Sequence, residues 1–455
     1  MTAPSEHLAA ARLRLPAGAC LEVRGRDPVI STPFAAGEVA ATALGLAGTA
    51  AARLHTLRTG ANQSVAVDVT GAGMSLLGFV RMKASGGTDL ARHHSPATGL
   101  YATRDERWIH LHGGFPALAR GITNLLGCAL EEKAIAAAVR AQDAFALEDA
   151  IASRGLCGAV VRSASEWAEH PQGRALTDLP AVEIERIGDA APVPLAAGTR
   201  PLDGIRVLDL TRVLAGPTCG RTLASHGADV LRIGAERLPS IEPFVIDTGH
   251  GKRNAFVDLN DATGRTQLEG LIDETDLFCQ SYRPGALAAR DLSPSALASR
   301  RPGIIYVSLC CYGHVGPWAD RAGWEQLAQS AVGIAAAGSR DGKPALIPAA
   351  ATDYTTGYLA AFGAIAALER RATEGGSWHV KVSLSQTGMW LTRLGERYDP
   401  DGATGLDRPE RFVTASDTAW GRLEHLGPII EMDRTPPSWD RPPAPLGTHR
   451  AEWLA

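Results

Sequence analysis

Short apolar runs alternate with amphipathic stretches between residues 201 and 311 of the chain. The apolar runs read IRVLDL, DVLRI, NAFVDL, LFCQSY and IIYVSLCC, and each has the length of a buried strand. Helical patterns stand between them, among them TGRTQLEGLIDE and LSPSALASR. Parallel strands that are covered by helices on both faces read as nearly continuous apolar runs. The region therefore predicts an α/β fold with a Rossmann-like parallel sheet.

The sequence also repeats itself. Gly37–Met74 and Gly357–Met389 both read as an Ala-rich helix, a Gly-containing turn, a Val-alternating strand and a helix start that ends in Gly-Met. A second pair of similar segments begins at Gly173 and at Gly421. We therefore predict unequal tandem halves, residues 30–200 and 201–455, which follow an N-terminal extension of residues 1–29.

The two predicted halves differ in content. The first carries a stretch of strand and helices, Leu100–Trp167, that predicts a smaller α+β domain, and the second has only a short polar connection there. The second opens with the Rossmann-like region and has a shortened C-terminal part. The join lies in the Pro/Gly-rich segment Asp189–Gly204.

Composition narrows the class of protein. The formal net charge of the 455 residues is −4 and the basic residues are scattered, which argues against a nucleic-acid partner. No apolar run approaches the roughly 20 residues of a membrane span, and the first residues do not read as a signal peptide. The seven cysteines show no CxxC and no metal-ligand spacing. We expect a cytoplasmic protein with reduced thiols, no metal site and no membrane partner.

The loop after the first predicted strand, Thr211–Gly220, is where a parallel sheet would bind a ligand. It contains no G-x-G-x-x-G, and a dinucleotide pyrophosphate needs those glycines for close approach of the backbone. An NAD-dependent oxidoreductase is therefore a poor interpretation.

Several long motifs resemble family III CoA-transferases, the group that includes formyl-CoA and carnitine CoA-transferases. The motifs are PLDGIRVLDLTRVLAGPTCGRTLASHGADVLRI, KRNAFVDL, SYRPGAL, YGHVGPWADRAGWEQLAQSAVG and ATDYTTGYLAAFGAIAALERR, in the order of the family. The earlier segments GLYATRDERWIHLHG, GLCGAVVRSASEW and EHPQGRA are similar to the small domain of the family. The resemblance implies the family III fold, with acyl-CoA as a substrate, no permanently bound cofactor and a carboxylic acid as acceptor.

The resemblance also implies a catalytic residue. Asp353, in TDYTTG, matches the aspartate that forms an acyl anhydride and then an aspartyl-CoA thioester. Taken alone, an Asp before an Ala-rich helix is more often its N-cap, and the two roles are compatible. At a helix N-terminus we expect this carboxylate to stay ionised. Counting back from Gly37 places Pro33 at the equivalent position of the first half.

Further site residues follow from the same match. Glu325 aligns with an acidic residue close to the aspartate, and His93 and His94 fall on a loop that covers the substrate in relatives. The expected CoA-binding residues are Leu214, Ala215, Val257, Asp258, Leu259, Asn260, Ser281, Tyr282, Arg283, Arg290, Ala322 and Trp324. Two positions that carry phosphate-binding arginines in relatives are Ala235 and Ala289 here, and we expect Arg283, Lys252 or Arg290 to compensate.

Other functions remain open at this point. Related racemases place a histidine where this chain has Trp324, so racemisation lacks a second base unless His93 or His94 supplies it. A lyase or hydratase acting on an acyl-CoA, or a non-catalytic CoA-binding paralogue, fits the same fold. Relatives form interlocked dimers, and we expect a homodimer here too. We also expect Leu100–Trp167 of the first half to close the Asp353 site.

Overall fold

The structure is a computed structural model that describes residues 4–85, 95–283, 285–404 and 410–454. Its largest unit is a seven-stranded sheet with the order β10-β9-β8-β11-β12-β13-β7. All neighbours pair in parallel except β7, which runs antiparallel to β13. The strands are β8 (Arg206–Asp209), β9 (Asp229–Gly234), β10 (Lys252–Phe256), β11 (Leu277–Gln280), β12 (Ile305–Cys310), β13 (Ser377–Ser383) and β7 (Val182–Gly188). The predicted mixed α/β class with a large, mostly parallel sheet is confirmed.

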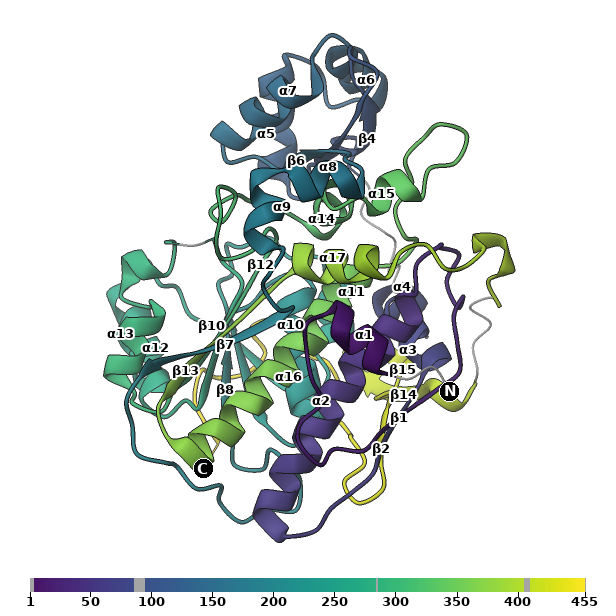
Figure 1. The fold of residues 1–455 in the computed structure, drawn as a ribbon. Helices are drawn as coiled ribbons and strands as arrows, with labels where there is room; N and C mark the ends of the chain where they lie inside the picture. The colour runs from purple at the N-terminus through teal and green to yellow at the C-terminus, as the bar shows by residue number, and fades with distance from the viewer. Residues whose placement is uncertain (1–3, 86–94, 284, 405–409, 455) are drawn as a thin grey trace.

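Helices cover both faces of this sheet (Figure 1). On one face α12 (Ala262–Asp273) and α13 (Pro294–Arg300) pack against Leu208, Phe278 and Tyr306. On the other face α10 (Ala215–Ser225) and α16 (Ala351–Glu374) pack against Val207, Cys279 and Val307. Successive strand residues thus alternate between two buried faces, which is why the strands read as unbroken apolar runs.

The strand order reverses between β8 and β11. From β8 the chain proceeds outward through β9 and β10, and it then returns to the other side of β8 through β11 and β12. At such a reversal the loops that follow neighbouring strands diverge and leave a crevice at the carboxyl edge of the sheet. The loop from Thr211 to Leu214 follows β8 and borders this point.

A smaller three-stranded sheet repeats part of the large one. It consists of β1 (Leu21–Arg24), β2 (Val65–Asp68) and β16 (Ile430–Met432), with β1 parallel and β16 antiparallel to β2. The same relations hold among β12, β13 and β7. Helix α2 (Ala36–Thr59) leads into β2 as α16 leads into β13, and the two helices pack side by side (Figure 1).

The starts of α2 and α16 match in detail. Each helix has 24 residues, and the preceding residues Ala35 and Ala350 have φ/ψ of −75°/55° and −80°/58°. The third residue is Glu38 in α2 and Asp353 in α16. The position that corresponds to Asp353 is therefore Glu38, and the assignment to Pro33 is wrong because it was counted from the glycines rather than from the helix starts.

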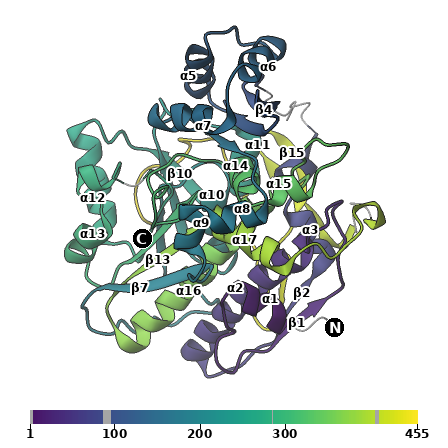
Figure 2. The same cartoon turned by 45° about the horizontal axis from the view of Figure 1, so that its top comes forward.

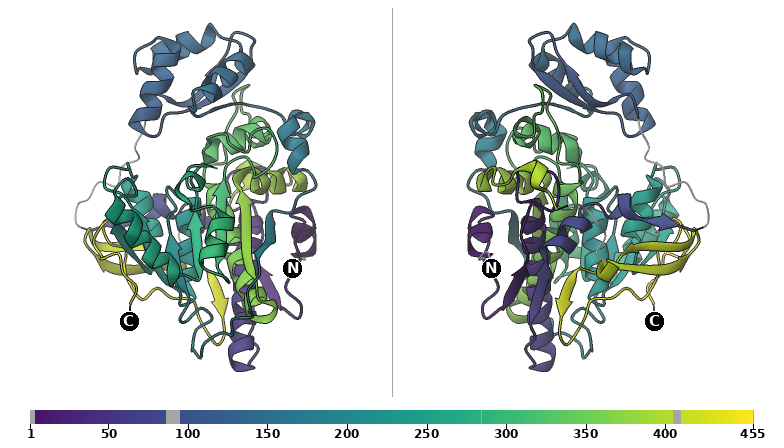
Figure 3. Two further views of the ribbon diagram at one scale, coloured as in Figure 1. Left: turned by 90° about the vertical axis from the view of Figure 1, so that its left-hand side faces the viewer. Right: turned by 90° about the vertical axis from the view of Figure 1, so that its right-hand side faces the viewer.

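The small α+β unit forms a separate layer at one end of the molecule (Figures 1 and 3). Its antiparallel sheet contains β4 (Thr98–Ala102), β5 (Trp108–His112) and β6 (Gly158–Val160), covered by α5 (Pro116–Leu126), α6 (Glu132–Arg140) and α7 (Ala144–Ser153). These elements share their own apolar core. Strands β5 and β6 also contact α14 (Glu325–Ala331) of the main body.

The remaining elements connect these units. Helices α8 (Ala164–Glu169) and α9 (Pro171–Leu176) lead from the small unit back to β7 (Figure 2). Strands β14 (Val413–Thr418), β15 (Gly421–Leu426) and β3 (Lys83–Ala84) form a third small sheet. The other helices are α1 (Pro4–Ala10), α3 (Val69–Ser75), α4 (Gly78–Arg81), α11 (Glu242–Thr248), α15 (Ile334–Ala337) and α17 (Leu384–Leu394), and short 3₁₀ turns cover Ala288–Arg290, Pro400–Gly402 and Glu410–Phe412.

The described residues bear on two of the expectations from composition. None of the helices there has the length and apolar character needed to cross a membrane. The same part of the chain contains no group of three or more His, Cys, Asp or Glu side chains arranged to hold a metal ion.

Candidate active site

Asp353 lies in the first turn of α16 and is 9% exposed. The helix has Ala350 as its N-cap and no side-chain capping bond, so the interpretation of Asp353 as an N-cap is wrong. No described residue donates a hydrogen bond to its carboxylate. A buried carboxyl group without donors is costly to ionise, which makes a purely structural role hard to explain.

Glu325 is the first residue of α14 and is also buried. Its Oε1 accepts a hydrogen bond from Nε2 of Gln329 (2.6 Å) and bonds from the N–H and hydroxyl of Thr352 (3.3 and 3.2 Å). It therefore joins the start of α14 to the start of α16, directly beside Asp353. The two acids thus lie at adjoining helix starts.

Both carboxyl groups of this pair resist ionisation. Burial raises the pKa of Glu325 to about 7, against hydrogen bonds from Gln329 and Thr352 that lower it. Burial and the charge of Glu325 raise the pKa of Asp353 well above its usual range. Burial and the charge of Glu325 thus oppose the ionisation of Asp353 that its place in the first turn of a helix favours.

The pair lies at one end of a cavity of about 380 Å³. The side chains around it are mostly apolar, and they come from six separate parts of the chain. They include Leu77, Phe79, Val80, Met82, Thr98, His112, Ile241, Pro243, Phe244, Leu346, Ile347 and Gln326. Thr98 and His112 belong to the small α+β unit, and His112 lies within the segment Leu100–Trp167 that was expected to close the site.

A second, smaller cavity of about 120 Å³ reaches Asp353 from the carboxyl edge of the sheet. Leu214, Ala215, Ser281 and Trp324 line it, and all four were predicted to bind CoA. Asp353 and Glu325 line both cavities, so they stand where the two meet.

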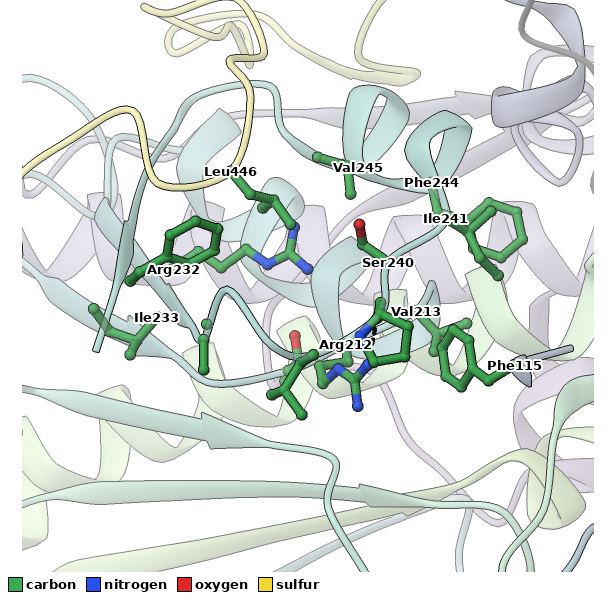
Figure 4. Close-up of a pocket in the computed structure, with 16 residues that line it drawn as sticks. Phe115, Arg212, Val213, Arg232, Ile233, Ser240, Ile241, Phe244, Val245 and Leu446 are labelled. Carbon is green, nitrogen blue, oxygen red and sulfur yellow. Dashed lines mark hydrogen bonds between the residues drawn. The ribbon is translucent and has the colours of Figure 1, made fainter. Parts of the chain in front are cut away.

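A crevice with an uncompensated positive charge adjoins these cavities through Arg212 and Val213 (Figure 4). Arg232, on β9, is 9% exposed, and among the described residues it makes neither a hydrogen bond nor an ion pair. Burial lowers its pKa, against the charge of Asp209, and the nearby Arg212 lowers it further. Two neighbouring guanidinium groups in a partly desolvated place favour an anion.

Other predicted CoA residues lie elsewhere along the same edge. Arg290 donates to the carbonyl of Leu259 (2.7 Å) and to Oδ1 of Asn260 (2.8 Å), so these residues form a surface cluster after β10. Arg283 donates to the carbonyl of Gly155 in the first half (2.6 Å). None of Val257, Asp258, Leu259, Asn260, Tyr282, Arg283, Arg290 and Ala322 lines the cavities around Asp353.

Lys252 was expected to replace a missing phosphate-binding arginine, but its contacts indicate a structural role. Its side chain is 1% exposed, and Nζ donates to Asp209 Oδ2 (2.8 Å) and to the carbonyl of Pro217 (2.7 Å). It fixes the start of α10 from within. His93 and His94 lie outside the described residues.

His112 was not among the site residues predicted from the sequence. Its ring stacks on Trp324 with centroids 4.1 Å apart and an interplanar angle of 18°. Nδ1 accepts the backbone N–H of Gly114 (3.4 Å), which leaves Nε2–H as the donor of the neutral ring. Burial lowers its pKa to about 3, and His110 adds to the shift.

A second pair of acids occupies the start of α2, and it is closed. Oδ2 of Asp27 accepts the N–H of Glu38 (2.8 Å), as Glu325 accepts from the start of α16. Glu38 is 2% exposed, and its carboxylate contacts His7 Nε2 (3.3 Å) and the hydroxyl of Tyr398 (2.9 Å). Burial raises the pKa of Asp27 to about 6. The first-half acid thus has partners on every side, whereas Asp353 faces two cavities.

Comparison with known proteins agrees with the resemblance seen in the sequence. The profile of CoA-transferase family III matches residues 202–398. An acyl-CoA transferase of Gibberella moniliformis is 29% identical over 78% of this chain and 73% of its own length. An acetyl-coenzyme A transferase of Hypoxylon pulicicidum is 31% identical, covering 68% of this chain and 57% of that protein. The succinyl-CoA:glutarate CoA-transferase of Mus musculus is 34% identical over 48% of this chain and 52% of its own.

Residues 202–398 of the chain thus match CoA-transferase family III, a family of enzymes. The chain spans little more than half the length of the Hypoxylon and mouse relatives.

Proposed function

We propose that the protein is a CoA-transferase that moves CoA between carboxylic acids through a covalent intermediate on Asp353. The observation that carries the proposal is the position of Asp353, buried and without donors, where two cavities of different character meet. One cavity suits the acyl group, and the other suits the pantetheine arm that leads toward Arg212 and Arg232. We further propose a Rossmann-like CoA-binding domain within the predicted halves, since the ligand would sit at the strand-order reversal.

The chemistry begins with an oxygen of Asp353 attacking the thioester carbonyl. The C–S bond breaks, CoA leaves as a thiolate, and a mixed anhydride forms. The thiolate then attacks the aspartyl carbonyl, which releases the first acid as a carboxylate and leaves an aspartyl-CoA thioester. The acceptor carboxylate attacks this thioester and expels the thiolate. The thiolate finally takes the new acyl group from the second anhydride and regenerates Asp353.

Asp353 must lose its proton before it attacks. In the free protein the Asp353–Glu325 pair favours a shared single charge near neutral pH, and Glu325 has the hydrogen-bond donors that stabilise that charge. Transfer of the charge to Asp353 leaves Glu325 protonated. The role proposed for Glu325 is to hold this proton while Asp353 acts as nucleophile.

We propose that His112 donates a hydrogen bond to the carbonyl oxygen of the acyl group. Its low pKa keeps the ring neutral, so that Nε2–H is a hydrogen-bond donor rather than an acid. A donor directed at the place where negative charge develops on the thioester oxygen lowers the barrier of each acyl-transfer step. The first half would thereby supply a group to the site of the second.

The proposal is tested by measuring CoA transfer from an acyl-CoA to an acceptor acid, with any donor and acceptor that the protein uses. Asp353→Asn should lose at least a thousandfold in kcat, because the nucleophile is gone. Glu38→Gln is the matched control, since Glu38 is the third residue of the equivalent helix α2 and should leave kcat within about threefold. Transfer that survives in Asp353→Asn would refute the covalent mechanism.

A second candidate function is favoured by the presence of His112 in the cavity of Asp353. An acyl-CoA racemase needs two groups that exchange the α-proton, and His112 and Asp353 are a candidate pair. The pKa of about 3 for His112 disfavours it, because the protonated ring would rarely form. Incorporation of deuterium at the α-carbon of an acyl-CoA, without any acceptor acid, would establish this activity.

A further inference from the structure

The cavity beyond Asp353 is lined mainly by apolar side chains, and this bears on which acyl group it can hold. Away from the two acids, its walls are formed by Leu77, Phe79, Val80, Met82, Ile241, Pro243, Phe244, Leu346, Ile347 and Pro348. We propose that the acyl group is that of an apolar monocarboxylic acid, with a branched or medium-length hydrocarbon chain and no second charge. This inference rests on the proposed CoA-transfer at Asp353 and names its substrate class.

The apolar wall is built jointly by the two predicted halves. The rings of Phe79, from the first half, and Phe244, from the second, meet edge to face with centroids 4.6 Å apart. The N–H of Phe79 donates to the hydroxyl of Tyr354 (3.0 Å), the residue after Asp353, and that hydroxyl donates to Asp247 (2.8 Å). Phe79 is therefore fixed relative to the reacting carboxyl group.

A second carboxylate in this cavity would be poorly accommodated. None of the lining residues that the structure describes is a lysine or an arginine, and His112 is neutral. At one end of the cavity, burial already raises the pKa of both Asp353 and Glu325, and the charge of Glu325 raises that of Asp353 further. A dicarboxylic acyl group would add a third acid to the same desolvated space, and an unpaired buried charge is costly.

A comparison of two acyl-CoAs of the same shape distinguishes the effect of charge from the effect of size. Succinyl-CoA and 4-methylpentanoyl-CoA have the same number and branching of heavy atoms, but only the first carries a terminal carboxylate. We expect kcat/KM to be at least about a hundredfold higher for the 4-methylpentanoyl compound, which equals about 2.7 kcal/mol. Along the series propionyl, butyryl and pentanoyl, kcat/KM should rise about fourfold for each buried methylene.

A charge-introducing variant tests the wall itself. Val80→Arg places a cation at a half-buried position of the cavity wall that the first half contributes. It should lower the ratio of kcat/KM for 4-methylpentanoyl-CoA to kcat/KM for succinyl-CoA by at least about tenfold. Leu57→Arg, at an exposed position of α2, is the control and should leave it unchanged. Equal or better use of succinyl-CoA by the unmodified protein overturns the inference, even if the variant does not fold.

Mass spectrometry with the same acyl-CoAs separates this inference from the proposed function. Each acyl-CoA is incubated with the protein and the Asp353 peptide is examined for an adduct. Adducts from succinyl-CoA alone overturn the substrate class and retain the chemistry. Failure of every acyl-CoA to modify Asp353 overturns the proposed function, and the substrate class with it.

Discussion

Replacing Glu325 with glutamine should make the protein more stable at alkaline pH but not at acidic pH. The amide has the shape of the protonated acid and can still accept from Gln329 and Thr352, but it carries no charge at any pH. In the native protein the pKa of Glu325 is raised from 4.5 to about 7, because the charged form is desolvated.

The sign and size of the effect follow from this shift. A group whose pKa is raised by folding binds its proton more tightly in the folded state, so stability is lost as pH rises from 4.5 through about 7. At 1.36 kcal/mol per pKa unit, the folded state carries a cost of about 3 kcal/mol at pH 8 that the glutamine variant avoids. This is an upper value, because Asp353 ionises more easily in the variant and then takes over part of the cost.

Urea unfolding of both proteins, followed by tryptophan fluorescence at pH 5 and pH 8, measures the difference. The variant should be more stable by roughly 1–3 kcal/mol at pH 8 and by less than about 1 kcal/mol at pH 5. The same difference at both pH values would refute the reasoning, since a change of packing alone would not depend on pH.

Three further outcomes are expected. Activity should rise with pH through the neutral range. Glu325→Gln should move the acid limb of the kcat/KM profile to lower pH, because it removes the charge that raises the pKa of Asp353. An unmoved profile would contradict the coupling of the two acids. His112→Ala should lower kcat about a hundredfold with little change in KM, and His112→Gln, which keeps a donor, should recover part of the loss across a flat pH profile. Arg232→Ala should raise the KM for the CoA substrate at least about tenfold, whereas the surface control Arg290→Ala should change it less than twofold.

The sequence predicted those parts of the fold that depend on local pattern. The run IRVLDL became β8, and its alternate residues Val207 and Leu208 face different cores. The motif around Asp353 carried enough family-specific residues to identify the nucleophile candidate. Both rest on neighbours within a few positions along the chain, which a sequence displays directly.

The rest of the site depends on contacts that local pattern does not contain. His112 ends a strand of the small unit and reaches the site only because β5 packs against α14. Arg232 reads as an ordinary strand residue, and its lack of a partner among the described residues appears only once β9 is placed in the sheet. The raised pKa of Asp353 depends on burial that a helix-terminus argument ignores.

The tandem halves, the domain limits and the homodimer stay predictions, although the matching starts of α2 and α16 support a duplicated origin. In this arrangement β7 completes the large sheet and β16 the small one, so each predicted half lends a strand to the other. A single chain would then contain one open site, at Asp353, and one closed copy, at Glu38.

Mass spectrometry of the intact peptide after incubation with an acyl-CoA and trapping with hydroxylamine tests the central claim most directly. The account predicts a hydroxamate on Asp353, present with the native protein and with Glu38→Gln, and absent when the acyl-CoA is left out. An unmodified Asp353 in a protein that turns over the same acyl-CoA would contradict the account.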